Sequence, residues 1–425
     1  MRLTMPHNNE AEQAVIGSCL INPSAIPDIL DAVTAEDFYS SVHQDIFQAI
    51  RDLYLAKTEI DVLTVSSKVP KDKMVYIYEL ADTTPTAGNV AAYVKILQAQ
   101  TMRRKLIKYG IEMQESAMDA DTDIDEVLLS TQKIILGLSL SKNTPLKNTK
   151  ELALSVFRKM ESGNHGVFQG LKTGFDELDH KLGGLKPGKL YILAARPRMG
   201  KTALSKNIAE FVATRSGLVF MASLEMDAEQ LAIRHISGIG KINGNKFNTG
   251  QFADSDWQKL TYAASKYSEL PIVYDDSGFQ TDIGIMAKAR KIKAEQGLSL
   301  IIIDYLQLVK ASEKPKSREE YVASISRNLK AMSKELQVPV LCLAQLNREC
   351  EREKRRPVLS DLRESGGIEQ DADAIIFIHR EHEYNPDASN SHAEAIVAKN
   401  RDGSTGIVEL VWNGEFTNFH TKEGL

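Results

Sequence analysis

The chain has 425 residues, enough for more than one domain, and 43% are hydrophobic and 26% charged, which is ordinary for a globular protein. Its three cysteines are widely spaced and fit neither a disulfide framework nor a metal-ligand cluster, so we expect a reducing, cytoplasmic setting. A net charge of −5 gives no overall basic field, so any nucleic acid has to be held by local groups. No apolar run approaches the roughly 18 residues of a membrane span, and residues 1–12 lack the apolar core of a signal peptide, so we expect neither export nor a membrane partner.

Residues 1–140 show helical patterns and little of the alternation typical of strands. Asn9 and Glu12 form a capping-box pattern at the start of the first expected helix. Further along, apolar residues recur at helical spacing, as in Ile46, Ile50, Leu53 and Tyr54. We therefore predict an all-α domain over residues 1–140.

A linker is expected over residues 141–168. It begins with the polar run 141–145, which ends in a proline, and continues with a short helix that ends near the glycines of 163–166. One face of this helix is apolar and carries Leu152, Val156, Phe157 and Met160. Such a stripe is compatible with packing on its own domain or on a neighbouring subunit.

From residue 169 to 425 the pattern changes to alternating strands and helices, which predicts an α/β domain with a mostly parallel, twisted sheet covered on both faces. Eight strands are expected, at 191–194, 219–223, 272–274, 300–303, 340–344, 375–378, 395–398 and 408–411. A helix between the fourth and fifth strands has one apolar face, formed by Val322, Ile325, Leu329, Met332 and Leu336.

The first strand of this domain runs into a turn and a helix in the pattern of a phosphate-binding loop. The loop consists of Ala195, Arg196, Pro197, Arg198, Met199, Gly200, Lys201 and Thr202. In such a loop backbone N–H groups face the phosphates, the lysine reaches the outer phosphates and the hydroxyl holds Mg²⁺. Ala195 stands where the common pattern has its first glycine. A Gly-Lys-Thr tripeptide also occurs in turns without a ligand, but the strand before it and the helical spacing after it favour a site for a nucleoside triphosphate.

Three further polar residues follow strands whose carboxyl ends should meet at the edge that carries this loop. Asp304 is expected to support the Mg²⁺ held by Thr202, although an aspartate often begins a turn after a buried strand. Glu225 is expected to polarise the water that attacks the γ-phosphate, with capping of the next helix as the alternative. Gln345 can hydrogen-bond the γ-phosphate without adding charge, but glutamines also end strands that bind nothing.

The region after the fifth strand holds candidates for contacts with partners. Residues 351–356 carry mixed charges and are compatible with a mobile loop that couples nucleotide state to a partner or with a solvated surface. Residues 360–367 offer small residues and the cation of Arg363 to a nucleic-acid backbone, and a helix-capping loop is the alternative. Lys399 and Arg401 are expected at a hairpin tip, from which an arginine can reach the γ-phosphate of another subunit.

Together these segments resemble replicative DNA helicases of the DnaB type, from a bacterium or one of its phages. The resemblance spans nearly the whole chain. Besides the phosphate loop, it rests on 9–18 (NEAEQAVIGS), 173–179 (TGFDELD), 183–188 (GGLKPG), 223–226 (SLEM), 304–308 (DYLQL), 344–348 (AQLNR) and the run 359–373.

The resemblance implies a homo-hexameric ring with an N-terminal helical collar, a linker helix that docks on the adjacent subunit, and RecA-like motor domains. Such a ring moves 5′ to 3′ along single-stranded DNA and unwinds forked duplex while it hydrolyses ATP. A helicase loader and a primase are the partners that it implies.

The resemblance also implies roles for the residues of the nucleotide site. Lys201 and Thr202 bind ATP and Mg²⁺, and Asp304 supports the metal. Glu225 activates water, and Gln345 reports the presence of the γ-phosphate.

Two further groups are matched by motif. Lys399 and Arg401 correspond to the pair that is offered to the neighbour's nucleotide. Arg363, Glu364 and Gly366 correspond to the loop that follows the DNA backbone.

The chain departs from the family pattern in two ways. Arg198 stands where relatives usually carry a small polar residue, which puts a second cation beside the phosphates. The chain is also shorter than the commoner bacterial members of the family, mainly in and around its N-terminal half. Two other functions are compatible with the same motor core: a RecA-like strand-exchange ATPase, which lacks this N-terminal helical domain, and a nucleotide-gated scaffold that loads DNA.

Overall fold

The computed structural model describes residues 4–83, 89–119, 149–161, 169–278, 280–304, 317–347 and 349–422, together with the short pieces 121–124, 127–128, 130–131, 134, 306 and 309. The chain forms two compact units, Met1–Leu146 and Lys147–Leu425. Each unit has a hydrophobic core of its own.

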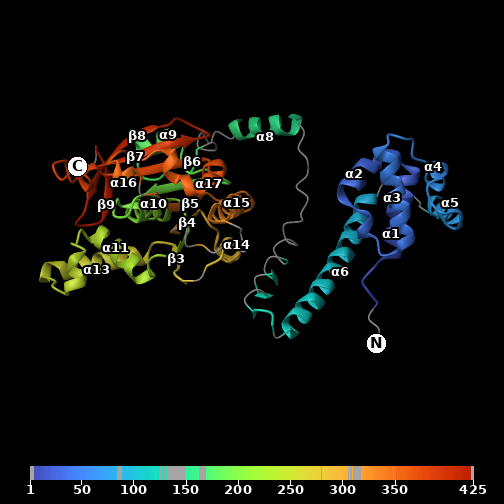
Figure 1. Ribbon diagram of the computed structural model, residues 1–425, viewed down its shortest axis with the longest axis horizontal. Helices are drawn as coiled ribbons and strands as arrows, with labels where there is room; N and C mark the ends of the chain where they lie inside the picture. Colours follow the sequence, from blue (N-terminus) through green and yellow to red (C-terminus); the bar gives the residue numbers. More distant parts are fainter. Residues whose placement is uncertain are drawn as a thin grey trace. The chain divides into compact units, whose positions relative to one another are not determined.

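The described part of the first unit is built from helices (Figure 1). They are α1 (Asn9–Ile21), α2 (Ile26–Ala32), α3 (Ser41–Leu55), α4 (Val62–Ser66), α5 (Met74–Thr83) and α6 (Val90–Met118), with 3-10 turns at Pro23–Ala25, Ala35–Asp37 and Lys71–Lys73. Their apolar faces meet in a core that includes Ile16, Ile46, Phe47 and Ile50. The predicted all-α N-terminal domain is confirmed.

The start of α1 differs from the predicted capping box. The helix begins after Asn8, whose side-chain oxygen accepts a hydrogen bond from the backbone N–H of Ala11 at 2.9 Å. Glu12 does not cap the helix: its side chain is buried, and its carboxylate lies 2.7 Å from Nδ1 of His43. The prediction for Asn9 and Glu12 is therefore wrong, because the carboxylate serves a contact between helices that are distant in sequence rather than the helix end.

The second unit contains a nine-stranded sheet. Its strands are β1 (Leu190–Ala195), β2 (Val219–Ser223), β3 (Ile272–Asp275), β4 (Leu300–Asp304), β5 (Val340–Gln345), β6 (Ala374–His379), β7 (His392–Asn400), β8 (Gly406–Asn413) and β9 (Asn418–Thr421). Their order is β3-β2-β4-β5-β1-β6-β7-β8-β9; the first six are mutually parallel and the last three extend the sheet in antiparallel fashion. The predicted mostly parallel sheet is confirmed, and β9 is the strand that the sequence did not predict.

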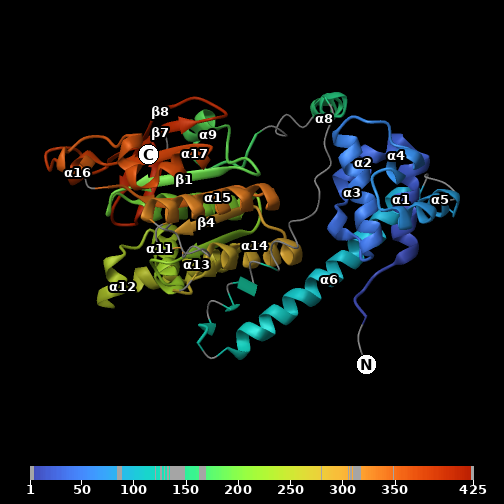
Figure 2. The same cartoon turned by 45° about the vertical axis from the view of Figure 1, so that its right-hand side comes forward.

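Helices cover this sheet on both faces (Figures 1 and 2). They are α9 (Asp176–Leu182), α10 (Lys201–Arg215), α11 (Ala228–Gly240), α12 (Asn245–Thr249), α13 (Asp254–Ser268), α14 (Asp282–Gln296), α15 (Arg318–Leu336), α16 (Glu349–Arg352) and α17 (Gly366–Asp371), with 3-10 turns at Leu359–Ser365 and Glu381–Glu383. Helix α10 packs Leu204 and Ile208 into the same core as Leu193 and Ile302 of the strands. The predicted apolar face of α15 is buried. Among the described residues, no helix combines the length and apolarity that crossing a bilayer requires.

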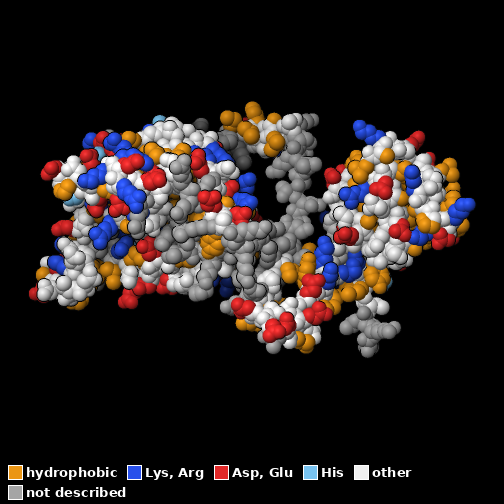
Figure 3. Space-filling model, viewed as in Figure 1, with side chains coloured by type: hydrophobic (Ala, Val, Ile, Leu, Met, Phe, Trp, Pro, Cys, Tyr) orange, Lys and Arg blue, Asp and Glu red, His pale blue; other side chains and the backbone are white. Residues whose placement is uncertain are grey.

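The predicted linker helix is α8 (Thr149–Glu161). Its apolar stripe is open to solvent in the single chain, since the side chains of Leu152, Val156, Phe157 and Met160 are 45–64% exposed. Figure 3 shows these hydrophobic side chains gathered over α8. The predicted polar run at 141–145 and the glycines of 163–166 lie outside the described residues.

Candidate nucleotide site

The phosphate loop connects β1 to α10 at the carboxyl edge of the sheet. Ala195 ends β1 and pairs with Gln345 at the end of β5. Gly200 caps α10 with φ of +94°, and a Cβ there would lie 2.7 Å from the ring of Phe419. Glycine is therefore needed at this position both for its conformation and for its size.

The alanine in place of the first glycine has a structural explanation. Ala195 has regular strand geometry, is buried, and contributes its methyl group to the core. Because the backbone here is not in the left-handed region, a side chain costs nothing and adds apolar contact. The departure from the common pattern at Ala195 is thus compatible with an intact loop.

The two arginines of the loop have different surroundings. Arg196 donates to the backbone carbonyl of Leu346 at 2.7 Å and forms an ion pair with Glu351, so its guanidinium ties the loop to the segment after β5. Arg198 is exposed and has φ of +69°, and its carbonyl accepts a hydrogen bond from Arg380 at 3.2 Å. Arg198 also lines the cavity described below, and Arg380 holds its backbone carbonyl.

Lys201 and Thr202 meet the carboxylate of Asp304. The hydroxyl Oγ1 of Thr202 donates to Oδ2 of Asp304 at 2.9 Å, and Nζ of Lys201 lies 3.5 Å from Oδ1 of Asp304. The side chain of Asp304 is fully buried, and its Oδ1 accepts no hydrogen bond among the described residues. A buried carboxylate oxygen next to a threonine hydroxyl and a lysine is suited to a cation that joins them.

Glu225 lies at the same edge, since Ser223 is opposite Asp304 in the pairing of β2 with β4. Its Oε2 is 4.0 Å from Nζ of Lys201, and its side chain is 52% exposed, which leaves it accessible to water. The N-cap of α11 is Asp227, which accepts a hydrogen bond from the backbone of Gln230 at 2.7 Å. The capping alternative for Glu225 is therefore wrong.

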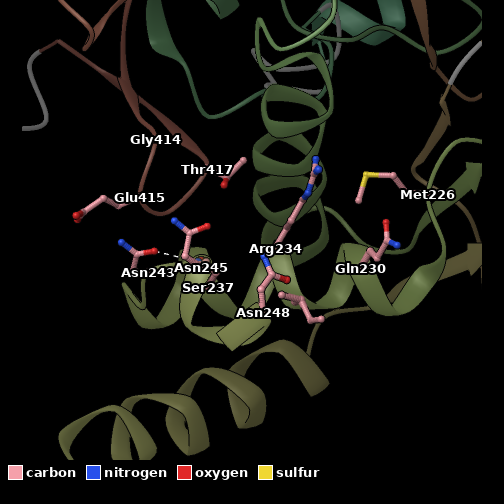
Figure 4. Close-up of a pocket in the computed structure, with 12 residues that line it drawn as sticks. Met226, Gln230, Arg234, Ser237, Asn243, Asn245, Asn248, Gly414, Glu415 and Thr417 are labelled. Carbon is pink, nitrogen blue, oxygen red and sulfur yellow. Dashed lines mark hydrogen bonds between the residues drawn. The ribbon is translucent and has the colours of Figure 1, made fainter. Parts of the chain in front are cut away.

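One cavity of about 370 Å³ is lined by most of these residues, whereas the buried side chain of Asp304 does not line it. Its lining includes the predicted residues Ala195, Arg196, Pro197, Arg198, Gly200, Lys201, Thr202, Glu225 and Gln345. Met199 is instead buried in the core beneath the loop. The sequence analysis missed Met226, Arg234, Trp412 and Thr417, which also line the cavity. Met226 belongs to the segment 223–226 that carries the resemblance, so that motif could have indicated it. Arg234, Trp412 and Thr417 lie outside the segments quoted above, and the folding of α11, of β8 and of the turn between β8 and β9 brings them here. Figure 4 shows Met226, Arg234 and Thr417 on the segments that carry them.

Lys399 and Arg401 lie at the opposite edge of the sheet. Lys399 pairs with Ile375 near the amino end of β6, and β1 and β6 run in the same direction toward the carboxyl edge. The ammonium of Lys399 donates to the carbonyl of Glu369, and Arg401 contacts Asp373 at 3.8 Å. This chain therefore does not bring the pair to its own cavity.

The placement of Lys399 at a hairpin tip is wrong. Strand β7 continues to Asn400, which pairs with Ala374, so Lys399 lies within the strand and the tip begins at Arg401. A shift of register between Ile375 and Ile376 allows the pairing with β6 to continue this far. Lys399 consequently lies within the strand, whereas Arg401 is the first residue of the turn and contacts Asp373 there.

The candidate nucleic-acid loop follows a segment whose charges are paired. Arg355 makes two hydrogen bonds to Asp361, at 2.7 and 2.9 Å, and Arg356 pairs with Glu394. The mixed-charge run is thus held by ion pairs to the body of the domain. The backbone of Arg363, Glu364 and Gly366 spans the end of the 3-10 turn Leu359–Ser365 and the start of α17, and their side chains lie outside the described residues.

The sequence matches two family models over most of its length. Residues 4–99 match the DnaB-like helicase N terminal domain, and residues 170–421 match the DnaB-like helicase C terminal domain. The chain belongs to the DnaB-like helicase family.

Individual relatives agree with this family. The replicative DNA helicase DnaB of Geobacillus stearothermophilus is 38% identical, with 98% of this chain and 95% of the relative covered. The replicative DNA helicase DnaC of Bacillus subtilis is 37% identical over the same shares. A solved structure of a DnaB-like replicative helicase, described with its interactions with primase, is 31% identical and has a TM-score of 0.74, covering 97% of this chain and 100% of that chain.

Membership of the DnaB-like family confirms the prediction of an ATP-dependent replicative DNA helicase with a RecA-like motor domain. It also confirms that the chain uses a nucleotide. The family favours this activity over strand exchange and over a scaffold that only loads DNA.

Proposed function

We propose that the chain works as a homo-hexameric ring that hydrolyses Mg²⁺-bound ATP, moves 5′ to 3′ on single-stranded DNA and unwinds forked duplex. The observation that carries this proposal is the separation of the site residues. Lys201, Glu225 and Asp304 share one edge of the sheet, whereas Lys399 and Arg401 lie at the other. A complete site then needs Lys399 and Arg401 of a second copy, and a repeated head-to-tail contact forms a ring when the rotation between copies closes.

Mg²⁺ fits the oxygen atoms that Thr202 and Asp304 bring together. Thr202 offers a hydroxyl, and Asp304 offers a buried oxygen that accepts no hydrogen bond within the described chain. Mg²⁺ is usually bound by one or two such groups together with phosphate oxygens and water, rather than by a cage of protein ligands. In keeping with that, the described residues contain no group of three or more His, Cys, Asp or Glu side chains arranged to hold a metal. The ion would neutralise charge on the outer phosphates.

Each residue group of the site has a proposed role in ATP hydrolysis. The backbone of Ala195 to Thr202 and the ammonium of Lys201 bind the phosphates. Glu225 accepts a proton from water, whose oxygen forms a bond to the γ-phosphorus. The bond from that phosphorus to the bridging oxygen breaks, and its electron pair leaves on ADP. Gln345 reports the γ-phosphate through a hydrogen bond.

Lys399 and Arg401 would serve the neighbouring subunit. Burial lowers the pKa of the Lys399 ammonium, and the adjacent charge of Arg401 lowers it further. Two cations held this close together are suited to a highly charged anion such as the outer phosphates of ATP. We assign Arg401 as the residue that neutralises charge developing on the neighbour's γ-phosphate.

The remaining assignments follow the same division of the chain. Residues 1–140 form the collar, 141–168 the linker and 169–425 the motor, and the exposed stripe of α8 docks on the adjacent subunit. Arg363, Glu364 and Gly366 follow the DNA backbone. A loader and a primase are the proposed partners, the latter because a solved relative is described with primase. We place the enzyme in the cytoplasm of a bacterial cell, whether encoded by the cell or by a phage.

The substitution Lys201→Ala tests this function in a forked-duplex unwinding assay. We expect unwinding and DNA-stimulated ATP hydrolysis to fall at least about a hundredfold, because the outer phosphates lose their main cation. Lys259→Ala, on the exposed surface of α13, is the matched control and should retain both activities. Unwinding that survives Lys201→Ala would refute the proposal. Normal DNA-stimulated hydrolysis by the unaltered chain without strand displacement on a pre-threaded fork would point to the loading scaffold instead.

A further inference from the structure

Asp373 lies between α17 and β6, at the amino edge of the sheet, and is 5% exposed. Two hydrogen bonds fix it to the central strand β1: its N–H donates to the carbonyl of Leu190 at 2.9 Å, and its Oδ2 accepts from the N–H of Leu190 at 2.8 Å. Its carbonyl accepts a hydrogen bond from the N–H of Arg401 at 2.9 Å. Because Asn400 pairs with Ala374, this bond continues the pairing of β6 with β7 by one residue. Asp373 therefore joins the backbone of Arg401 to the centre of the sheet.

The carboxylate of Asp373 is surrounded by cations from three separate segments. Its Oδ2 also accepts a hydrogen bond from Nζ of Lys330 in α15 at 2.5 Å. Its Oδ1 lies 3.5 Å from Nζ of Lys189 and 3.8 Å from Nη1 of Arg401. Burial raises the pKa of this carboxyl, but hydrogen bonds from Lys330 and from the backbone of Leu190 outweigh burial and lower the pKa. Two lysines thus share the charged carboxylate with Arg401, so this acid alone does not neutralise the arginine.

The guanidinium of Arg401 has a second fixed contact. Its Nη2 donates to the backbone carbonyl of Gln370 in α17, and the ammonium of Lys399 donates to the carbonyl of Glu369 in the same helix. The side chain of Arg401 is nonetheless 49% exposed, and a guanidinium has five N–H donors, so donors remain for an anion that approaches from outside. The arginine is therefore held by its own domain and open to a second molecule at the same time.

We propose that Asp373 is a positioning residue of the ATPase, which holds Arg401 in place for the nucleotide bound by the adjacent subunit. This inference rests on the proposed function, in which Arg401 neutralises charge on the neighbour's γ-phosphate. A long side chain that is ordered before the phosphate arrives loses less conformational freedom on contact. Because Asp373 is fixed to β1, it orders the arginine relative to the sheet rather than to the turn that follows β7.

The neighbouring acid Asp402 provides a matched comparison. Its carboxylate lies 3.6 Å from Nζ of Lys186 and 3.2 Å from Nζ of Lys189, so the two acids share one lysine. Within the part of the chain that the structure describes, the guanidinium of Arg401 forms an ion pair with Asp373 and none with Asp402. Removing the charge of Asp402 therefore changes the same group of cations without removing the contact that positions Arg401.

The substitution Asp373→Asn in the full-length assembly tests the assignment. The amide keeps the shape of the side chain and can still accept from Leu190, but it lacks the charge that aligns the guanidinium. We expect ATP hydrolysis to fall at least about tenfold. Affinity for ADP should stay within about twofold, because the cavity lies at the other edge of the sheet, and Asp402→Asn should retain hydrolysis within about twofold. Wild-type hydrolysis by Asp373→Asn, or a matching loss of ADP affinity, would overturn the proposal.

Mixed rings show whether the defect acts on the neighbouring subunit. Lys201→Ala subunits keep their arginine and Asp373→Asn subunits keep their cavity, so roughly a quarter of the interfaces are complete when equal amounts are co-expressed. Hydrolysis should therefore recover to roughly a quarter of that of the unaltered chain. Mixtures of Asp373→Asn with Arg401→Ala should not recover, because neither variant supplies a positioned arginine. General damage to the Asp373→Asn subunit would prevent recovery in both mixtures, and that result would refute positioning.

The pair Lys201→Ala and Arg401→Ala separates this inference from the proposed function. If these two variants do not complement each other in mixed rings, the shared site fails whatever Asp373 does. If they do, and Asp373→Asn does not complement Lys201→Ala, only the role of Asp373 is refuted.

A double-mutant cycle tests whether Asp373 acts through Arg401. The variant that combines Asp373→Asn with Arg401→Ala should hydrolyse ATP no more slowly than Arg401→Ala, since the arginine to be positioned is absent. Additive losses would contradict the assignment. If native mass shows that Asp373→Asn does not assemble, Asp373→Glu takes its place in every measurement, because it keeps the charge that Lys330 contacts. Its displaced carboxylate should lower hydrolysis in a way that Lys201→Ala subunits restore, and hydrolysis equal to that of the unaltered chain would refute positioning.

Discussion

At the scale of single residues, the phosphate loop depends on the absence of a side chain at Gly200. Its φ of +94° is unfavourable for other residues, and the rings of Phe419 and Trp412 close the space at 2.7 and 3.3 Å from a would-be Cβ. Both aromatic residues come from the C-terminal strands β8 and β9. The loop is therefore shaped by residues more than two hundred positions away in the chain.

Gly200→Ala should destabilise the motor domain by about 2 kcal/mol or more and weaken nucleotide binding, because left-handed strain adds to the clash with Phe419. Gly250→Ala is the control, since Gly250 has φ of +69° with open space around it and should cost only about 1 kcal/mol. Thermal unfolding and nucleotide titration measure both effects. The explanation fails if the two variants unfold at the same temperature.

Glu12 shows how a buried carboxylate can stabilise a fold. Burial alone raises its pKa, but hydrogen bonds from His43 and from the backbones of Tyr39 and Ser40 outweigh burial and lower the pKa. His43 in turn contacts the hydroxyl of Tyr76 at 2.8 Å. A lowered pKa means that the charged form stabilises the fold above the ordinary pKa of glutamate, and that this contribution is lost as the pH falls through the folded value.

Glu12→Gln should therefore destabilise the first unit at neutral pH, by about 1–3 kcal/mol, and reduce its loss of stability in acid. Amide hydrogen exchange in α1 and α3 of the full-length chain, at neutral and acid pH, measures the effect. Glu10→Gln is the control, because Glu10 is exposed in the first turn of the same helix. Equal exchange rates in the two variants would contradict the role of Glu12.

At the scale of elements, the strands show what a pattern can and cannot predict. Buried parallel strands such as β4 are continuous apolar runs, and the predicted strands all lie within observed ones. The short strand β9 carries Asn418 and His420 and has no such signature. It forms because Phe419 enters the core and pairs with Trp412 of β8. Tertiary contacts, rather than the local sequence, therefore determine that β9 forms a strand.

The elements around the cavity are also fastened to one another by charges. Arg196 ties the phosphate loop to Glu351, and Arg355 ties the next segment to buried Asp361. Charge runs such as 351–356 are common on solvated surfaces, so the sequence alone left their role open. The partners lie on other elements, and only the fold pairs them.

At the scale of the whole molecule, the residues proposed for the nucleotide site lie at two edges of one sheet. The loop, Glu225 and Asp304 lie at the carboxyl edge, and Arg401 lies at the amino edge. Since one rigid sheet separates them, a subunit cannot fold to join the two groups. Assembly of several copies in the same orientation is the simplest arrangement in which every cavity receives an arginine.

Subunits carrying Lys201→Ala and subunits carrying Arg401→Ala should therefore complement each other. Each variant alone should lose at least about a hundredfold in hydrolysis, with nucleotide binding retained by Arg401→Ala. In mixed rings co-expressed from equal amounts of the two variants, roughly a quarter of the interfaces pair an intact cavity with an intact arginine. ATP hydrolysis should therefore recover to roughly a quarter of that of the unaltered chain. Native mass of the mixtures confirms assembly. Activity of the mixture no greater than the sum of the two variants would contradict a shared site.

The sequence by itself determined the fold class, the position of the phosphate loop and the residues at the ends of β2, β4 and β5. It could do so because these features are local: apolar runs, turn glycines and polar strand ends are read within a few residues. The tertiary structure decided the rest. It buried Glu12, placed Lys399 inside a strand, brought Trp412 against Gly200 and brought Arg234 to the wall of the nucleotide cavity. Such placements depend on packing between segments far apart in the chain, and no local pattern records that packing.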